Sequence, residues 1–390
     1  MSVSGRNYQG LDGPLGLDRY FCKDTDSQGF HMPLEAELTV VGETSGRWRT
    51  RLSDERERRD SPAVLQELSS TEFSWTFMDH EGTAFPITVE WLLHKKDYVP
   101  LAAVRKRKRI DRLMPPSFLK LTTRISYSDE YINRHLRPRS ADPSTPDISR
   151  EDLETIIQDT SVRDFGGVLT EILLAANIAR PDSLDFNASY LFIDSKFIEN
   201  GRSGPSDLRS AVDNATDRGW PHFGQMEIHT VMRWLARVPG FRARHAESPL
   251  GRALAAASYL FWPSWGQTDH LALVWALLGL EALYTRGNAG LQEQLGGKTT
   301  AFLGNRTSHK KDLPNMYNFR SRFIHGDLDF PYAYNEADAS PEYERFNTDR
   351  FASENIAVAM LFSTLQRMCL ENRFELSFHH AVSPPGSSTA

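Results

Sequence analysis

The feature that most constrains the fold of this chain is a series of six segments with helical periodicity in its C-terminal part. Each segment places apolar residues three and four positions apart, which is the spacing of one face of an α-helix. Short stretches separate most of them, so neighbouring helices are expected to pack antiparallel. The sequence therefore predicts an all-α bundle over residues 223–376. The six segments are 224–238, 250–261, 269–285, 290–302, 313–325 and 353–373.

The first part of the chain has a different period. Apolar and polar residues alternate over 34–40 and 73–77, and a turn-like segment at 79–82 precedes a further strand-like run over 83–91. Alternation with a period of two is typical of strands that bury one face. We therefore expect an α+β protein in which a β-rich N-terminal domain, residues 1–136, precedes the helical bundle.

A linker and a mixed α/β region are predicted between these two parts, over residues 137–222. The first residues of this region are rich in Pro, Ser, Asp and Thr, a composition typical of surface linkers. Helical spacing follows over 151–158 and 167–179, and a strand-like run covers 189–197. The stretch 201–219 is rich in Gly, Ser, Asp and Asn, and we interpret it as a long loop.

Composition limits the class of protein. Of the 390 residues, 40% are hydrophobic and 11% aromatic, which is enough for packed cores, and only residues 377–390 are expected to form a disordered tail. Cys22 and Cys369 are the only cysteines, so we expect neither a disulfide framework nor a cysteine-ligated zinc site. There is no signal-peptide pattern and no window apolar enough to span a membrane. We expect a cytoplasmic protein with no cofactor and no metal.

The densest positive charge is a run of five residues in the predicted N-terminal domain. A net charge of −6 gives no overall basic signature, so contact with a nucleic acid would depend on a local patch of this kind. Clustered cations release counterions when they bind phosphates, which makes the run a candidate RNA contact; a solvated face or linker is the other interpretation. The run consists of Arg105, Lys106, Arg107, Lys108 and Arg109.

An arginine and a histidine stand five positions apart at the end of the helix expected over 313–325. Arg320 carries a permanent planar cation suited to a phosphate, and His325 can exchange a proton near neutral pH. RNA contains its own nucleophile, the ribose 2′-hydroxyl, so these two groups are sufficient in principle to cleave it without a metal. The alternative is that the arginines near this position form surface ion pairs and that His325 interacts with the negative end of the helix.

Three segments in this part of the chain resemble the HEPN superfamily, and within it the ApeA-like group. They are residues 275–284, with the sequence WALLGLEALY, residues 298–304, with KTTAFLG, and residues 317–326, with YNFRSRFIHG. The resemblance covers roughly residues 225–375. It implies a helical bundle that forms a homodimer, so that two copies of the motif face one composite cleft.

The resemblance also implies an activity, that of a metal-independent endoribonuclease in stress, toxin or anti-phage systems. The family's motif residues correspond to Arg320 and His325, and Ser321 is the polar residue next to the arginine. RNA is then the expected substrate, and a regulatory ligand or protein is expected at the N-terminal domain. Relatives controlled by AMP addition have a tyrosine two residues after the histidine, where this chain has Asp327, so that form of control is not implied.

Helical geometry separates the two motif residues. A step of five residues turns about 140° around an ideal helix, so Arg320 and His325 do not share a face, whereas Arg322 lies three residues before the histidine and does. Completion of the pair across a dimer is one way to bring them together. Alternatives are a distortion of the helix near Gly326 or a side chain of Arg320 that reaches around.

Two carboxylates are candidates for supporting roles. Glu281 lies within an otherwise apolar segment, where an unpaired carboxylate is costly, so it is expected to pair with Arg320 or Arg322, either to orient the site or as a structural ion pair. Asp327 follows the histidine and either holds its ring or belongs to a plain turn.

Three functions are therefore open from the sequence. The first is an endoribonuclease that cuts single-stranded RNA with Arg320 and His325 at a dimer cleft. The second is a HEPN module that binds RNA or protein without catalysis, regulated by the N-terminal domain. The third is a structural adaptor with no affinity for RNA.

Overall fold

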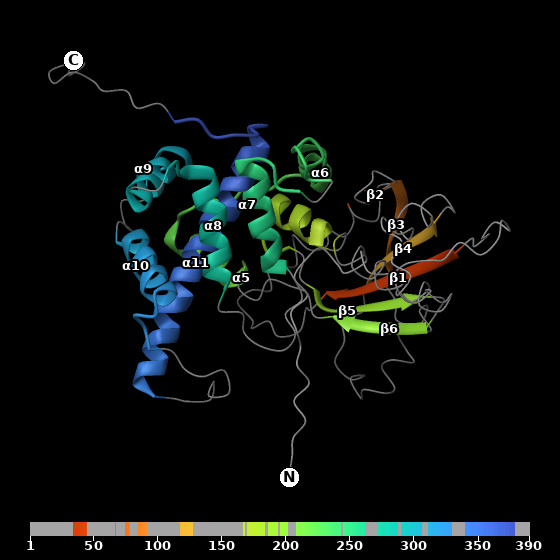
Figure 1. Cartoon of the computed structure of the whole chain (residues 1–390), viewed down its shortest axis with the longest axis horizontal. Helices are drawn as coiled ribbons and strands as arrows, with labels where there is room; N and C mark the ends of the chain where they lie inside the picture. The colour runs from red at the N-terminus through yellow and green to blue at the C-terminus, as the bar shows by residue number, and fades with distance from the viewer. Residues whose placement is uncertain are drawn as a thin grey trace, which may run out of the picture.

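The computed structural model describes fifteen portions of the chain. They are residues 34–44, 67, 75–78, 84–92, 118–127, 167, 170–183, 186–193, 196–201, 208–242, 245–261, 271–287, 290–305, 311–329 and 340–378. The helices lie together on one side and a sheet lies on the other, with α9 and α10 on the side away from the sheet (Figure 1). The predictions made for residues 105–109 and 151–158 lie outside the described residues.

Six strands form one antiparallel sheet in the order β2-β3-β4-β1-β5-β6. β1 lies inside the sheet, where it pairs with β4 on one side and with β5 on the other. The strands are β1 (Leu34–Thr44), β2 (Trp75–Met78), β3 (Ala84–Leu92), β4 (Phe118–Tyr127), β5 (Phe186–Ile193) and β6 (Lys196–Gly201).

The sheet contains strands from both sides of the predicted limit at residue 136. β5 and β6 follow that limit in the sequence, and β5 pairs with β1 through Val40 and Leu191. The four earlier strands precede it. The division into an N-terminal β-rich domain and a connecting region stays a prediction.

The described residues from 208 to 378 are helical and contain no strand, which confirms an all-helical C-terminal part. A further helical stretch covers residues 170–179. The helices are α5 (Leu208–Arg218), α6 (Ile228–Leu235), α7 (Pro249–Ser258), the short 3₁₀ helix η3 (Tyr259–Phe261), α8 (Ala272–Tyr284), α9 (Leu291–Leu303), α10 (Asp312–Ile324) and α11 (Pro341–Leu370).

The prediction of a loop over 201–219 was wrong, because α5 occupies Leu208–Arg218. The stretch is mostly polar, but its few apolar residues have helical spacing and form a buried stripe. They are Leu208, Ala211, Val212 and Ala215. The composition of the stretch is that of a loop, but the positions of its few apolar residues are those of a helix.

The last helix starts well before the predicted residue 353. α11 begins at Pro341, and the hydroxyl of Ser340 accepts a hydrogen bond from the Tyr343 backbone N–H at 3.2 Å. A serine N-cap followed by proline is a strong start signal. Its first turns are mostly exposed, so they lack the apolar period on which the prediction relied.

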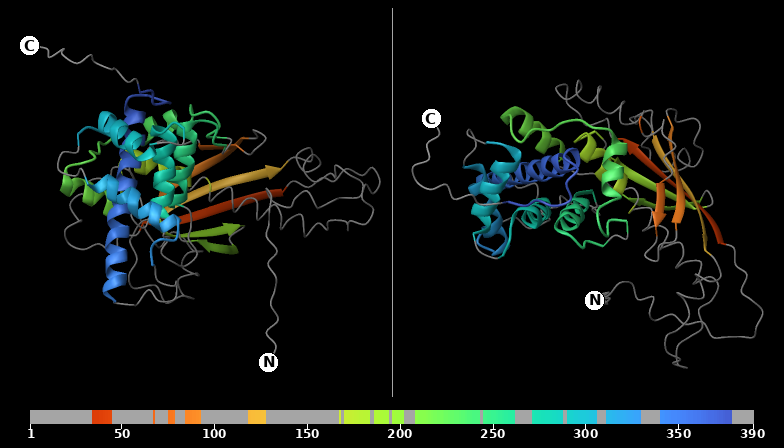
Figure 2. Two further views of the ribbon diagram at one scale, coloured as in Figure 1. Left: turned by 60° about the vertical axis from the view of Figure 1, so that its left-hand side comes forward. Right: turned by 90° about the horizontal axis from the view of Figure 1, so that it is seen from above.

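α11 is the central helix of the bundle and contacts each of α5 to α10 (Figure 2). Its buried polar side chains bond to backbone groups of neighbouring segments. The amide of Gln366 donates to the carbonyls of Ile178 and Gly224, at 2.9 and 3.0 Å, and accepts from the Gly224 N–H at 2.7 Å. These bonds fasten the end of helix 170–179 and the chain before α6 to the core.

α8 packs closely on α11 because Gly279 has no side chain. A Cβ at this position would lie 2.9 Å from Leu361 Cδ1 and 3.4 Å from the Ala253 carbonyl oxygen in α7. One turn later the Tyr284 hydroxyl bonds to the Thr364 hydroxyl at 2.9 Å inside the core. α8 is therefore fixed in position between α7 and α11.

In the part of the chain that the structure describes, no helix is long and apolar enough to cross a bilayer.

Candidate functional site

α10 carries the candidate motif and buries one face against α11. Leu313, Met316 and Phe319 are buried, and the rings of Phe319 and Phe323 contact Phe346 of α11 with centroid distances of 5.7 and 6.4 Å. These contacts fix the rotation of α10 about its axis. The neighbouring face, which carries Tyr317 and Arg320, is directed towards Glu281 of α8.

Glu281, Tyr317 and Arg320 form a half-buried polar network between α8 and α10. The Tyr317 hydroxyl donates a hydrogen bond to Glu281 Oε1 at 2.9 Å, and Arg320 Nη2 lies 4.0 Å from Glu281 Oε2. The side chains of Glu281 and Arg320 are only 16% and 26% exposed. Glu281 lies in an apolar helix, where an unpaired carboxylate is costly, and Arg320 is the arginine that pairs with it.

Burial and Glu281 both act on the Tyr317 hydroxyl. Burial is the larger effect, and the adjacent carboxylate adds to it, so the pKa of Tyr317 is raised above the ordinary value of 10.0. Tyr317 therefore stays a hydrogen-bond donor at neutral pH. No role was predicted for Tyr317, although its position three residues before Arg320 places both residues on one face of the helix.

The Arg320 guanidinium is not saturated by these contacts. Its Nε is buried and has no hydrogen-bond partner among the described residues. An ion pair at 4.0 Å leaves N–H donors of the group available to an incoming anion. The site therefore holds a cation near the surface that is oriented by one carboxylate.

His325 caps the C-terminal end of α10, and its backbone is fixed there. Gly326 adopts a left-handed φ of 76°, its N–H bonds to the Phe323 carbonyl at 3.4 Å, and the Asp327 N–H bonds to the Arg322 carbonyl at 2.8 Å. This pair of bonds is a Schellman motif, for which glycine is the favoured residue. The His325 side chain is exposed at this ordered helix end.

The structure does not bring His325 into contact with Arg320 within one chain. No hydrogen bond or ion pair joins the two among the described residues, as the angle of about 140° between them predicts. Ser321 and Asp327 are exposed beside them. Arg322 is also exposed, and its Nη2 donates to the Asp327 carbonyl at 3.3 Å, so it reinforces the turn after the helix.

The segment 298–304 supports the end of α8. Lys298 Nζ donates to the Tyr284 carbonyl at 2.6 Å and to Gln294 Oε1 at 2.8 Å. Partial burial, with a smaller effect of Arg286, lowers the pKa of Lys298. A cation at the last carbonyls of a helix is favourable, so α9 helps to hold the helix that carries Glu281.

Apolar side chains lie exposed on the same two helices. Leu278 in α8 is 42% exposed and Ile324 in α10 is 48% exposed, and each is within four residues of Glu281 or Arg320 in sequence. Tyr259 and Trp275 stack at the other end of α8, with ring centroids 4.1 Å apart. Exposed apolar side chains therefore lie on the same two helices as the polar network.

The described cysteine and acidic residues do not form a reactive thiol site or a metal site. Cys369 is buried and not in a disulfide, and burial raises its pKa to about 12, so it remains a thiol at neutral pH. Cys22 lies outside the described residues. Within the described ranges, no three His, Cys, Asp or Glu side chains are grouped as ligands for a metal ion.

Comparison of the chain with protein-family models, with curated proteins and with solved structures gave no match. The resemblance to the HEPN superfamily therefore stays an interpretation of the sequence.

Proposed function

We propose that this protein is a metal-independent endoribonuclease of the HEPN type that cuts single-stranded RNA at a cleft between two copies of the chain. The observation that carries the proposal is the arrangement at the end of α10. An oriented arginine, Arg320, and an exposed histidine, His325, lie on one short, ordered helix. A toxin or an effector of anti-phage defence is the expected biological setting.

The chemistry needs one proton acceptor, one proton donor and a cation. An unprotonated His325 takes the proton of the 2′-hydroxyl, whose oxygen then forms a bond to the adjacent phosphorus. The bond from phosphorus to the 5′-oxygen breaks, and a protonated imidazole returns a proton to that oxygen. Arg320 stabilises the negative charge that develops on the phosphoryl oxygens. The products are a 2′,3′-cyclic phosphate and a 5′-hydroxyl.

In this proposal, a second copy of the chain brings an arginine and a histidine of the motif close together. Because Arg320 and His325 face different directions on α10, the pair is completed by the partner chain. The exposed Leu278 and Ile324 beside the network support this arrangement, since apolar residues are enriched in the cores of homodimer interfaces. The predicted β-rich N-terminal domain would then regulate the site, with residues 105–109 as an RNA contact.

The proposal is tested with purified full-length protein, a fluorescent single-stranded RNA and excess EDTA. We expect cleavage by the wild type and its loss in His325→Ala, while His222→Ala, a change at another exposed histidine of the bundle, keeps it. A DNA strand of the same sequence should stay intact, because it lacks the 2′-hydroxyl. Cleavage that persists in His325→Ala or that requires a divalent metal would contradict the mechanism.

A second function is favoured by one feature of the same site. Glu281 already forms an ion pair with Arg320, and no hydrogen bond joins His325 to Arg320 within one chain among the described residues. This arrangement also suits a module that binds RNA or protein without cleaving it. Such a module would bind RNA in EDTA without scission. Its affinity would not change in His325→Ala, which distinguishes it from the nuclease.

A further inference from the structure

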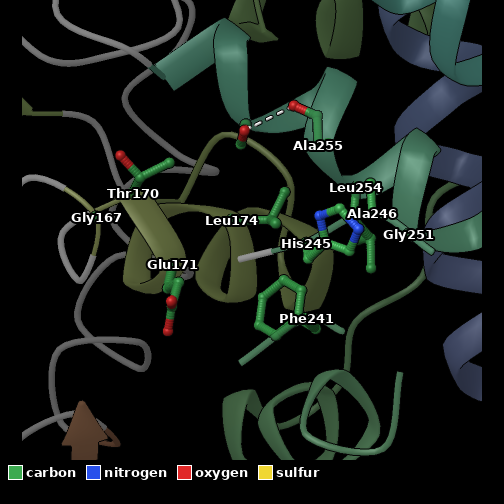
Figure 3. Close-up of a pocket in the computed structure, with 11 residues that line it drawn as sticks. Gly167, Thr170, Glu171, Leu174, Phe241, His245, Ala246, Gly251, Leu254 and Ala255 are labelled. Carbon is green, nitrogen blue, oxygen red and sulfur yellow. Dashed lines mark hydrogen bonds between the residues drawn. The ribbon is translucent and has the colours of Figure 1, made fainter. Parts of the chain in front are cut away.

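A cavity of 330 Å³ lies on another side of the bundle, away from α10. Its walls come from the start of helix 170–179, from the loop before α7 and from one face of α7 (Figure 3). None of its lining residues belongs to the network around Glu281 and Arg320. Ligand pockets in proteins commonly have volumes of about 300–1,000 Å³, so this cavity is large enough for a small molecule.

The cavity exists because α7 presents small residues to it. Gly251 and Ala255 lie one turn apart on the lining face, and the buried Leu254 also lines the cavity. Leu174 faces them from helix 170–179 and is almost completely buried. Larger residues at the two small positions would fill the space, so the sequence of α7 leaves it open.

A hydrogen bond joins two described residues of the segment before α7 that forms the third wall. Gly240 adopts a left-handed φ of 73°, and its carbonyl accepts a hydrogen bond from the His245 N–H at 2.9 Å. A Cβ on Gly240 would lie 2.1 Å from the His245 carbonyl oxygen, so only glycine fits there. This bond therefore holds the backbone of His245 next to Gly240 at the cavity.

The polar groups of the cavity are few and lie at its margin. His245 is exposed and its ring stands beside Leu174 and Ala246, whereas the Glu171 carboxylate points away from that ring (Figure 3). The Ser258 hydroxyl donates its proton to the Ala255 carbonyl at 2.6 Å. The imidazole is thus the side chain best placed to form a hydrogen bond with a molecule in the apolar part.

We propose that this cavity binds a small, uncharged aromatic molecule, with its ring between Leu174, Leu254 and Phe241 and one hydrogen-bonding group at His245. The mainly apolar lining favours a ligand of this kind, because a charged group would lose much of its hydration there. The proposal is independent of RNA cleavage, since it concerns a separate set of residues.

The test uses the full chain and ligand-observed NMR with three probes, indole, phenol and benzyl alcohol. We expect at least one to bind, with an affinity reduced by Ala255→Phe to below detection and unchanged by Ala301→Phe, a matched change at an exposed alanine of α9. Loss of one hydrogen bond in His245→Ala should weaken binding by about 2- to 10-fold.

His245→Ala also keeps the test decisive if Ala255→Phe does not fold, since the histidine side chain is exposed and its removal leaves no hole in the core. Unchanged affinity in His245→Ala would overturn the assigned polar contact. Binding that survives in folded Ala255→Phe, or no binding of any of the three probes to the wild type, would overturn the site itself.

Discussion

Replacing Gly279 by alanine is expected to destabilise the bundle relative to the same change at Gly297. Both glycines lie inside helices, Gly279 in α8 and Gly297 in α9. Alanine favours the helix over glycine by about 1 kcal/mol at either site. The two positions differ in their surroundings, which isolates the effect of packing.

The difference can be estimated from the space around each glycine. At Gly297 an added Cβ meets nothing within 4 Å, so alanine should raise the free energy of unfolding by up to about 1 kcal/mol. At Gly279 it meets Leu361 Cδ1 at 2.9 Å and Cδ2 at 3.1 Å. Leu361 is completely buried, so it has little room to move, and overpacking of this kind costs about 1–3 kcal/mol.

The assay is urea-induced unfolding of full-length protein, followed by circular dichroism at the helical band. Gly297→Ala should be more stable than the wild type, and Gly279→Ala should be less stable than Gly297→Ala by about 1–3 kcal/mol. Because Glu281 is two residues further along α8, Gly279→Ala tests the packing that positions the site. Equal stabilisation by the two alanines would refute the close contact of α8 with α11.

Two further predictions concern buried tyrosines. Tyr317→Phe removes the hydrogen bond to Glu281 and should lower the free energy of unfolding by about 1–2 kcal/mol at pH 7, measured by the same urea titration; an unchanged value would mean that the bond contributes nothing. Burial raises the pKa of Tyr284 as well, so its phenol stays protonated in the folded protein while it ionises near pH 10 once unfolded. Its contribution to stability is therefore complete below pH 10 and is lost as the pH rises above it, by up to about 1.4 kcal/mol per pH unit. Urea titrations between pH 9 and 11 should show that the free energy of unfolding falls less steeply with pH in Tyr284→Phe than in the wild type. An identical pH dependence in the two proteins would contradict the burial of Tyr284.

Helices with strong apolar periods could be predicted from the sequence to within a few residues. α8, α9 and α10 begin and end close to the expected positions, because their periodic apolar residues form the core. α5 and the first turns of α11 were missed, since their residues are mostly polar and only their few buried positions reveal the helix. Strand β4 was not predicted either.

The candidate site was predicted in part. The pairing of Glu281 with an arginine follows from the cost of a buried charge, and the separation of Arg320 from His325 follows from helical geometry. The role of Tyr317 depends on how α8 and α10 pack, which no local pattern contains. The cavity beside α7 is formed by three segments far apart in the sequence, so only the folded chain reveals it.

Mixing two inactive variants tests the shared cleft most directly. Arg320→Ala and His325→Ala are each expected to be inactive on RNA in EDTA. If the pair is completed across a dimer, subunit exchange should restore about a quarter of the wild-type rate, because half of the dimers are mixed and each mixed dimer keeps one intact pair of two. No recovery, with subunit exchange demonstrated, would contradict a cleft shared between two chains.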